Sequence, residues 1–228
     1  MSVHEEEPKE KAESSTGESP GVRRLGYKRP MDLSILVLAH LFPLLLPVWA
    51  LLWTIIPFLI WLEDRGPIFF LQERLGLGGR RFFLIKFRSM RTPESGEDWP
   101  EFTSQGDPRM TRVGRVMRRL ALDELPQVIN LWKGDISFVG PRPLPPDMHE
   151  SYVKEDRDFA RRLLVTPGLT GLAQTRLRRH ARARDRSRYD RLYIHRASMW
   201  LDLKLIALSV WLTVCGRWGK GRREFQRR

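Results

Sequence analysis

Several features that would narrow the function at once are scarce in this sequence. Its 228 residues contain a single cysteine, Cys215, which excludes an internal disulfide framework and fits a reducing compartment. No internal repeat is visible, so a repeat architecture is excluded, and the length suits one compact domain. Acidic residues number only 27 against 40 lysines and arginines, which leaves a formal charge of +13. A chain this basic is expected to meet phosphorylated small molecules, an anionic membrane surface or nucleic acid.

The first 22 residues have almost no apolar side chains. Six glutamates and two lysines stand among the first twenty, together with serine, threonine, glycine and proline. Such a segment cannot bury enough surface to offset the entropy of ordering it, so we predict a disordered acidic tail over residues 1–22. A cleaved secretory signal is not expected, because it would begin basic and turn apolar within a few residues.

Charged residues are absent from residues 33–62. A continuous helix over this run would be about 45 Å long, at about 1.5 Å per residue. The hydrocarbon core of a bilayer is only about 30 Å thick, and two full spans would need about 40 residues. Pro43, Pro47 and Pro57 each remove a backbone donor and favour a kink. The run therefore predicts a bent membrane segment.

Both flanks of this segment are basic, from Arg23 to Arg29 on one side and from Arg65 to Arg88 on the other. Basic residues concentrate on the cytoplasmic side of a membrane. A helix-break-helix that enters and leaves by the same face satisfies both flanks, whereas a single span satisfies one. We therefore predict a membrane-embedded re-entrant segment over residues 23–65, with a single span as the alternative.

The backbone at such a break needs internal hydrogen-bond partners, because lipid offers none. Ser34, His40 and Thr54 are the few polar side chains in the segment. We interpret His40 as a partner of the broken backbone rather than as a functional residue.

A second apolar stretch, residues 199–215, is interrupted by polar residues. Its apolar side chains recur at helical spacing, and they are Trp200, Leu203, Ala207, Val210, Trp211 and Val214. Asp202, Ser209 and Thr213 lie off that stripe. We predict an amphipathic interfacial helix, with a core-packing helix as the alternative. The basic tail that follows, residues 216–228, favours contact with anionic membrane lipid.

The intervening residues 66–198 predict a small mixed α/β domain, so the fold class is α+β and membrane-associated. Aromatic and β-branched runs at 68–74 and 81–87, separated by glycines, indicate a β-hairpin. Residues 91–108 indicate a loop. Helices are expected from the remaining patterns: a basic amphipathic one with Val113, Val116, Met117 and Leu120 on its apolar face, a short one at 123–133 and a longer one at 148–164.

Two adjacent carboxylates, Asp123 and Glu124, directly follow the arginine-rich helix. A carboxylate can act as a covalent nucleophile toward phosphorus. Neighbouring carboxylates together with substrate phosphates also form the usual partial cage for Mg²⁺. An alternative is that Asp123 caps the following helix while Glu124 complements its dipole. Downstream, two prolines fix the backbone around Arg142, which prepares its guanidinium for bidentate phosphate contact.

From Lys28 to about Val214 the sequence resembles the bacterial sugar transferases, the monotopic phosphoglycosyl transferases. The matching motifs occur in the family's order, at 28–32 (KRPMD), 66–74 (GPIFFLQER), 86–90 (KFRSM), 122–127 (LDELPQ), 133–143 (KGDISFVGPRP), 167–174 (PGLTGLAQ) and 201–204 (LDLK). No single motif is decisive, but their number and order outweigh the capping alternative.

The resemblance implies that Asp123 attacks the β-phosphate of a UDP-sugar, releases UMP and carries the sugar phosphate. Polyprenyl (undecaprenyl) phosphate then accepts that group, in a first membrane step of polysaccharide or glycoconjugate biosynthesis. Glu124 matches the second carboxylate of the dyad, with the cofactor Mg²⁺ held at Asp123 and Glu124. Arg118 and Arg142 match substrate-binding arginines, and Asp190 matches an acidic position at the substrate site, or else a structural ion pair. The resemblance also implies that residues 66–198 form a cytosolic catalytic domain, at the cytoplasmic face of the bacterial inner membrane.

Two departures from the family pattern bear on these expectations. The segment from Asp32 to Gly66 is several residues longer than in compact members, so the break is not fixed at Pro43 or Pro47. After Gln174 an arginine-dense run replaces the family's Asn-Gly-Arg-like turn, which leaves the sugar open. We also expect the chain to lack the additional transmembrane helices of larger members.

The alternative function is a non-enzymatic, membrane-tethered nucleic-acid-binding protein. Its support is the arginine cluster at residues 176–191 and the basic C-terminus. Aromatic platforms are not interleaved with these arginines, and no groove-reading motif is present. We therefore expect no nucleic-acid partner.

Overall fold

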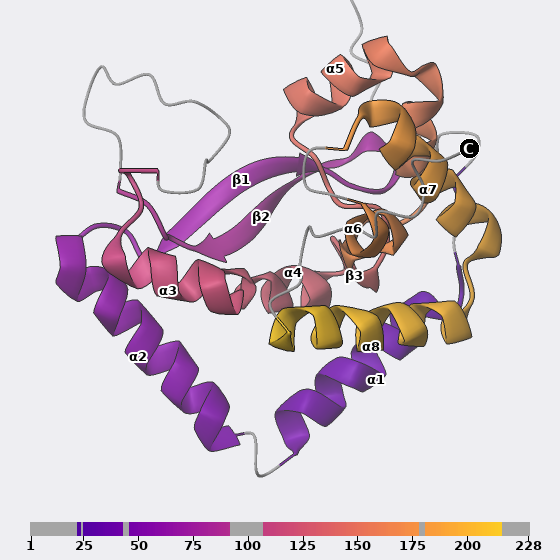
Figure 1. The fold of residues 1–228 in the computed structure, drawn as a ribbon. Coiled ribbons are helices and arrows are strands. Elements are labelled where there is room, and N and C mark those ends of the chain that lie inside the picture. The colour runs from indigo at the N-terminus through magenta and orange to yellow at the C-terminus, as the bar shows by residue number, and fades with distance from the viewer. Residues whose placement is uncertain (1–21, 24, 43–45, 92–106, 178–180, 216–228) are drawn as a thin grey trace, which may run out of the picture.

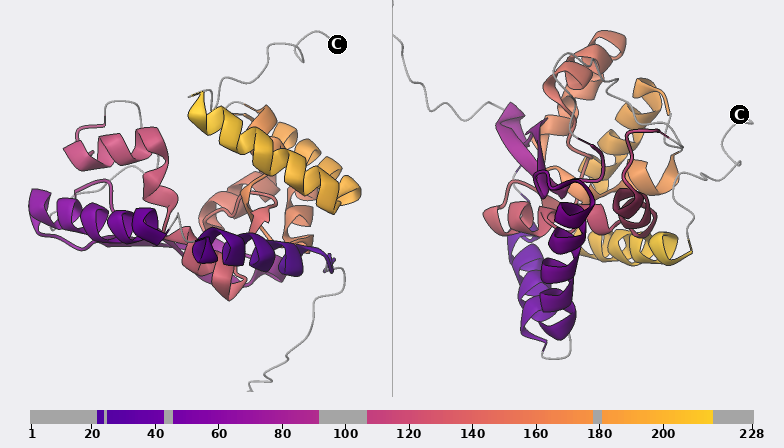
Figure 2. Two further views of the ribbon diagram at one scale, coloured as in Figure 1. Left: turned by 90° about the horizontal axis from the view of Figure 1, so that it is seen from below. Right: turned by 90° about the vertical axis from the view of Figure 1, so that its left-hand side faces the viewer.

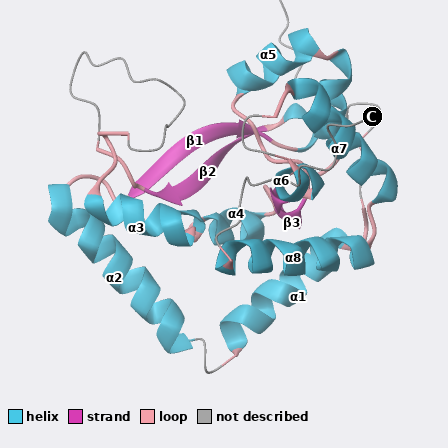
Figure 3. Cartoon of the chain, in the orientation of Figure 1, coloured by secondary structure: helices cyan, strands magenta, loops and turns pink. Residues whose placement is uncertain are grey.

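The computed structural model describes residues 22–23, 25–42, 46–91, 107–177 and 181–215 (Figure 1). Within these residues the chain is mostly helical and carries two small sheets, which confirms a mixed α/β body (Figure 3). The two tails predicted at residues 1–22 and 216–228 lie outside the described residues, apart from Val22.

Two helices, α1 (Lys28–Leu41) and α2 (Leu46–Asp64), form a V that extends from the body (Figures 1 and 2). The break therefore falls between Leu41 and Leu46. Pro47 is in the first turn of α2, where its missing N–H costs no helical hydrogen bond. Among the described residues, α2 is the one helix long and apolar enough to cross a membrane. Its 19 residues span about 28 Å, close to the thickness of the hydrocarbon core.

Side chains near the apex of the V bond to the helix backbone. Pro43 has no N–H, so it cannot serve the carbonyl of Ala39 four residues earlier. The indole Nε1 of Trp49 donates to that carbonyl instead, at 3.0 Å. The His40 ring stacks on Trp49 at 4.7 Å between centroids and bonds through Nδ1 to the Leu36 carbonyl at 2.7 Å. Because the Leu36 carbonyl lies inside α1 and not at the break, the role of His40 as a partner of the broken backbone stays a prediction.

The predicted hairpin is present, with its first strand beginning one residue later than expected. Strand β1 (Phe69–Leu75) pairs antiparallel with β2 (Arg81–Phe87), so that Phe69 lies opposite Phe87 and Leu75 opposite Arg81. The turn η2 (Leu77–Gly79) joins them, with Gly78 at φ 64° and Gly79 at φ 84°. These left-handed conformations explain why two glycines occur there.

A second sheet joins the motif at residues 133–143 to the motif at residues 167–174. Strand β3 (Ser137–Val139) pairs in parallel with β4 (Gly168–Thr170). At Gly140, directly after β3, the two backbones approach closely. A Cβ on Gly140 would lie 2.4 Å from the carbonyl oxygen of Thr166. A Cβ on Gly168 would in turn lie 2.0 Å from the nitrogen of Gly140. The two glycines allow this contact.

The remaining helices follow the predicted order with two corrections. The short helix expected at 123–133 begins four residues later, at Gln127, because residues 122–124 form a separate 3₁₀ turn. Helix α3 (Arg112–Leu120) begins at Thr111, whose hydroxyl accepts from Gly114 N at 2.9 Å, and α4 (Gln127–Lys133) ends at the left-handed Gly134. The single long helix expected at 148–164 is wrong. The chain forms α5 (Pro146–Glu155) and the 3₁₀ segment η4 (Arg157–Leu164), because Asp156 is extended and its carboxylate accepts from Asp158 N at 3.1 Å. Helices α6 (Leu172–Arg176) and α7 (Ala183–Arg196) follow.

The predicted helix at 199–215 is α8 (Met199–Val214). Its apolar stripe faces away from the body, with Trp200 67% exposed and Val214 81% exposed. The side packed on the body includes Asp202, which is fully buried, and Ser209, which bonds to Thr170. The outward apolar stripe favours the interfacial interpretation over a core-packing helix.

Both ends of the V are fastened to the body by polar contacts. At the start of α1, the buried Lys28 ammonium donates to Asp202 Oδ2 at 2.8 Å and to the Val139 carbonyl at 2.5 Å. Asp32 accepts from the hydroxyl of Ser137 at 3.1 Å. At the end of α2, Asp64 forms an ion pair with Arg88 of the chain just after β2.

Candidate functional site

The carboxylates Asp123 and Glu124 lie in a short 3₁₀ turn, η3 (Leu122–Glu124), between α3 and α4. Helix α3 stops because Ala121 adopts a left-handed conformation at φ 56°. The residue at the N-cap of α4 is Pro126, and no side chain caps that helix. The capping alternative for Asp123 is therefore wrong. Both carboxylates are partly exposed at a turn, where a ligand can reach them.

Two cations from other elements hold the Glu124 carboxylate. Its Oε1 lies 3.2 Å from Lys86 Nζ, on β2, and 3.3 Å from Arg142 Nη2, in the loop after β3. Burial alone would raise the pKa of Glu124, but Arg142 and Lys86 outweigh it and bring the pKa to about 2. Glu124 is thus a fixed anion at neutral pH.

Asp123 experiences the opposite balance. Burial, and then the negative charge of Glu124, raise its pKa above the ordinary value, while Lys86 and Arg118 oppose the rise. Arg118, in the last turn of α3, donates from Nε to the hydroxyl of Ser89 at 2.8 Å. Two adjacent carboxyl groups are therefore held in different electrostatic states, which is how paired carboxylates come to have separate roles.

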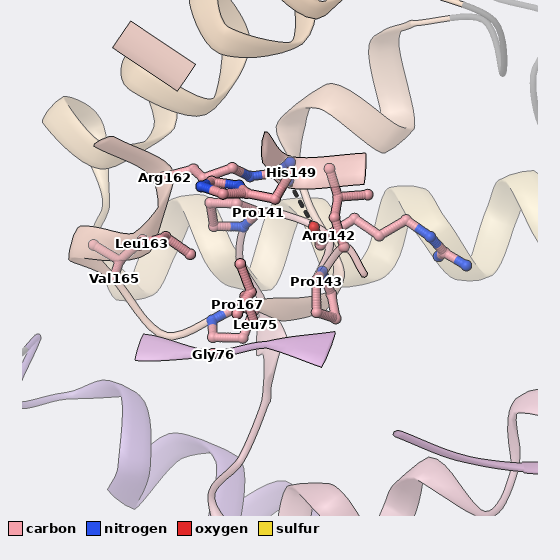
Figure 4. A pocket seen from close by; sticks show the side chains of 11 residues that line it. Leu75, Gly76, Pro141, Arg142, Pro143, His149, Arg162, Leu163, Val165 and Pro167 are labelled. Atoms are coloured by element: carbon pink, nitrogen blue, oxygen red, sulfur yellow. Dashed lines mark hydrogen bonds between the residues drawn. The ribbon is translucent and has the colours of Figure 1, made fainter. Parts of the chain in front are cut away.

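The loop that carries Arg142 is held at three consecutive carbonyls. Gly168 N donates to the Pro141 carbonyl at 2.9 Å, Arg162 Nη2 to the Arg142 carbonyl at 2.6 Å, and Arg74 Nη1 to the Pro143 carbonyl at 3.2 Å. The Arg142 side chain points away from these contacts and is 41% exposed (Figure 4). The cavity behind the loop measures about 10 Å³, room for no more than a water molecule. The backbone is fixed while the guanidinium remains accessible, as the two prolines predict.

Lys86 is a site residue that the sequence reasoning missed. It belongs to the KFRSM motif, which carried no assigned role. A signal was available, because side chains two apart on a strand share a face. Phe82 and Leu84 are buried core residues of β2, and Lys86 continues their face. A lysine on the core side of a strand needs a charged partner, and Glu124 is that partner.

Asp190 does not contact the dyad directly. It is 4% exposed on α7, and its Oδ2 lies 3.3 Å from Nη2 of the buried Arg162. Burial raises the pKa of Asp190, and Arg162 opposes the rise. Asp190 thus forms the buried ion pair, and its role toward a substrate stays a prediction.

The residues that the structure describes contain no group of three or more histidine, cysteine or acidic side chains that could enclose a metal ion. The dyad supplies two carboxylates. Mg²⁺ is commonly bound by one or two carboxylates together with substrate phosphates and water. Asp123 and Glu124 fit that mode and do not form a complete cage of their own.

Three bacterial sugar phosphotransferases are similar to the chain over 65–80% of its length. It is 41% identical over 197 residues to an undecaprenyl-phosphate glucose phosphotransferase of Komagataeibacter xylinus, covering 80% of this chain and 35% of that protein. It is 38% identical over 187 residues to the UDP-N-acetylgalactosamine-undecaprenyl-phosphate N-acetylgalactosaminephosphotransferase of Aeromonas hydrophila, covering 80% and 42% respectively.

A UDP-glucose:undecaprenyl-phosphate glucose-1-phosphate transferase of Caulobacter vibrioides is 42% identical over 154 residues, covering 65% of this chain and 57% of the relative. The chain thus spans between 35% and 57% of the length of these three relatives. The model of the bacterial sugar transferase family matches residues 23–216, which hold the V, the dyad and the Arg142 loop. The chain belongs to the bacterial sugar transferase family.

Proposed function

We propose that the chain transfers a sugar-1-phosphate from a UDP-sugar to undecaprenyl phosphate. The names of the relatives support this reaction class. The observation that carries it is the dyad: Glu124 is held as an anion by Lys86 and Arg142, and Asp123 lies beside it with a raised pKa. Phosphoryl transfer depends mainly on positioning and on neutralising charge. This cluster offers a nucleophile, Asp123, among three cations, which are Lys86, Arg118 and Arg142.

In the first step a carboxylate oxygen of Asp123 attacks the β-phosphorus of the UDP-sugar. The bond from that phosphorus to the bridging oxygen breaks, and UMP leaves with the bridging oxygen and its electron pair. The sugar phosphate remains on Asp123 as an acyl phosphate. The guanidinium of Arg142 binds phosphate oxygens and Lys86 offsets the added negative charge, because both already face the dyad.

In the second step a phosphate oxygen of undecaprenyl phosphate attacks the same phosphorus. The bond from phosphorus to the Asp123 oxygen breaks, and the carboxylate is regenerated. The product is undecaprenyl diphosphate sugar. Arg118, in the last turn of α3, acts electrostatically on Asp123 and supplies a further cation for phosphate.

Asp123 and Glu124 would hold Mg²⁺ together with the diphosphate of the substrate. The ion would neutralise phosphate charge and lower the fraction of Asp123 that is protonated. The chain's own contribution is to keep Glu124 ionised through Lys86 and Arg142.

We also propose that the V is re-entrant and that the dyad faces the cytoplasm, where UDP-sugars are made. The start of α1 is attached to the body through Lys28 and Asp32, and the end of α2 through Asp64. Two helix ends fastened to one compact body support entry and exit by the same membrane face. Apart from Ile56 and Ile60, the described side chains of α2 are at least partly exposed, as lipid contact requires.

Asp123→Asn tests the chemistry, because it removes the nucleophile while keeping the shape. We expect loss of UMP release from UDP-glucose and from UDP-N-acetylgalactosamine, with folding and membrane binding unchanged. Intact mass spectrometry without acceptor should detect a sugar-phosphate adduct on the native chain and none on the variant. Native rates of UMP release from Asp123→Asn would refute the covalent mechanism.

Cysteine labelling tests the topology. Gly26→Cys precedes α1, where a Cβ meets nothing within 4 Å, and Arg65→Cys follows α2 at an exposed position. In a Cys215→Ser background, both should resist a membrane-impermeant thiol reagent in intact cells and react after permeabilisation. Labelling of one position from outside would show that the segment spans the membrane.

A further inference from the structure

One buried ion pair is connected to the candidate site through the protein backbone. Arg162 of η4 has a side chain only 7% exposed, and it lies over the ring of the buried Phe159 at 4.5 Å. Its Nη2 donates to the carbonyl of Arg142 at 2.6 Å (Figure 4). The same atom lies 3.3 Å from Asp190 Oδ2. A buried cation is costly unless it is paired, and Asp190 supplies the pairing charge.

The position of Arg162 relative to the loop is specific. Each carbonyl from Pro141 to Pro143 accepts a hydrogen bond from a different donor. The donor to the Arg142 carbonyl is Arg162, the cation paired with Asp190. On the other side of the same residue, the Arg142 guanidinium reaches Glu124 at 3.3 Å. A continuous series of contacts therefore runs from Asp190 on α7, through Arg162 and the backbone of Arg142, to the dyad.

Resting on the proposed function, we propose that Arg162, held by Asp190, is a positioning residue that sets the Arg142 guanidinium for phosphate binding. Arg162 binds the carbonyl of Arg142 and touches no substrate. Asp190 acts through Arg162, which gives the acidic position in α7 a role without substrate contact. Misplacement of a reacting or binding group by about 1 Å can cost on the order of 100-fold in rate, so a fixed carbonyl matters.

Arg162→Met together with Asp190→Asn is the appropriate perturbation. Changing one partner alone would leave an unpaired buried charge and endanger folding. The double change removes both charges, and Met fills much of the volume of the arginine stem.

The fold also provides a matched control. Asp158 of η4 and Arg191 of α7 form an ion pair between the same two elements, one residue from Asp190, with side chains 36–39% exposed. Arg191→Gln with Asp158→Asn breaks that pair without touching Arg142.

The first readout is kcat/KM for the UDP-sugar in two backgrounds. We expect the Arg162→Met/Asp190→Asn change to lower kcat/KM by on the order of 10- to 100-fold when Arg142 is present. In an Arg142→Ala background the same change should cost less than about 3-fold, because its effect passes through Arg142. An equal loss in both backgrounds, or an equal loss in the Asp158/Arg191 control, would overturn the proposal.

The second readout is hydrogen exchange of the peptide containing the Arg142 loop. Exchange should accelerate in the Arg162/Asp190 variant and not in the control. Unchanged exchange would overturn the proposal. If the native chain releases no UMP from any UDP-sugar, the proposed function fails, and the exchange measurement alone then decides whether Arg162 fixes the loop.

Discussion

Lys86→Met offers the sharpest test of the electrostatics at the dyad. The pKa of Glu124 is about 2 against an ordinary value of 4.5, although burial acts in the other direction. The difference of about 2.5 corresponds to about 3.4 kcal/mol at about 1.36 kcal/mol per pKa unit. Arg142 and Lys86 both lower this pKa through their charge and through hydrogen bonds, and their joint effect exceeds the net difference because burial opposes it. Loss of Lys86 removes one hydrogen bond to a charged group, worth about 1.5–3 kcal/mol, and one cation beside the transferring phosphate, so kcat/KM should fall by roughly tenfold or more.

The pH dependence separates this cause from a general loss of fit. The pKa values of both Asp123 and Glu124 are lowered by Lys86, so both rise when it is replaced. Since the nucleophile must be deprotonated, the acidic limb of the kcat/KM profile should move to higher pH in Lys86→Met. Lys133→Met, at an exposed position in α4, is the control and should leave the limb in place. An acidic limb at the native pH in Lys86→Met would refute the reasoning.

Two further predictions concern the fold. Trp49→Phe keeps the ring stacked on His40 but leaves the Ala39 carbonyl without its indole donor, so thermal unfolding should show a loss of about 1–3 kcal/mol. A melting temperature within error of the native one would show that the indole bond is dispensable. Gly140→Ala should destabilise by about 1–3 kcal/mol, because its Cβ would lie 2.4 Å from the Thr166 carbonyl oxygen. Gly26→Ala, with open space around its Cβ, should be nearly neutral, and equal melting of the two variants would contradict this account.

The elements that the sequence predicted are those with a long or distinctive pattern. The hairpin of β1 and β2 has seven residues in each strand and glycines in between, so its period was readable. Strands β3 and β4 have three residues each, too few to show a period. Each residue of β3 pairs with a residue of β4 that is 31 positions later in the sequence. The interruption at Asp156 was missed because an acidic residue inside a charged helical stretch gives no warning of its extended backbone.

The candidate site was predictable only as far as local motifs reach. The DE pair and the PRP segment each stand out in the sequence, so Asp123, Glu124 and Arg142 were identified. Lys86 and Arg162 were not, because their importance comes from tertiary neighbours. Asp190 was found as a matching position, but its pairing with Arg162 depends on how α7 packs against η4.

The V and the dyad share their supports. The Glu63 carboxylate, at the end of α2, accepts from the backbone nitrogens of Arg112 at 2.6 Å and Val113 at 3.0 Å, the first turn of α3. Arg29, at the start of α1, donates to the carbonyls of Leu131 at 2.7 Å and Trp132 at 2.6 Å, the last turn of α4.

Each leg of the V thus satisfies the free backbone groups at one end of a helix, with charges that also complement the two helix dipoles. The turn with Asp123 and Glu124 connects these two helices, α3 and α4. The placement of the dyad relative to the V is therefore set at the polar ends of α1 and α2 and by Ile56 and Ile60 of α2, which pack in one apolar cluster with Met117 of α3 and Leu122 of η3. The exposed apolar side chains of α2, such as Leu51 and Phe58, remain free to face lipid, and substitutions there should alter membrane insertion before they alter the geometry of the dyad.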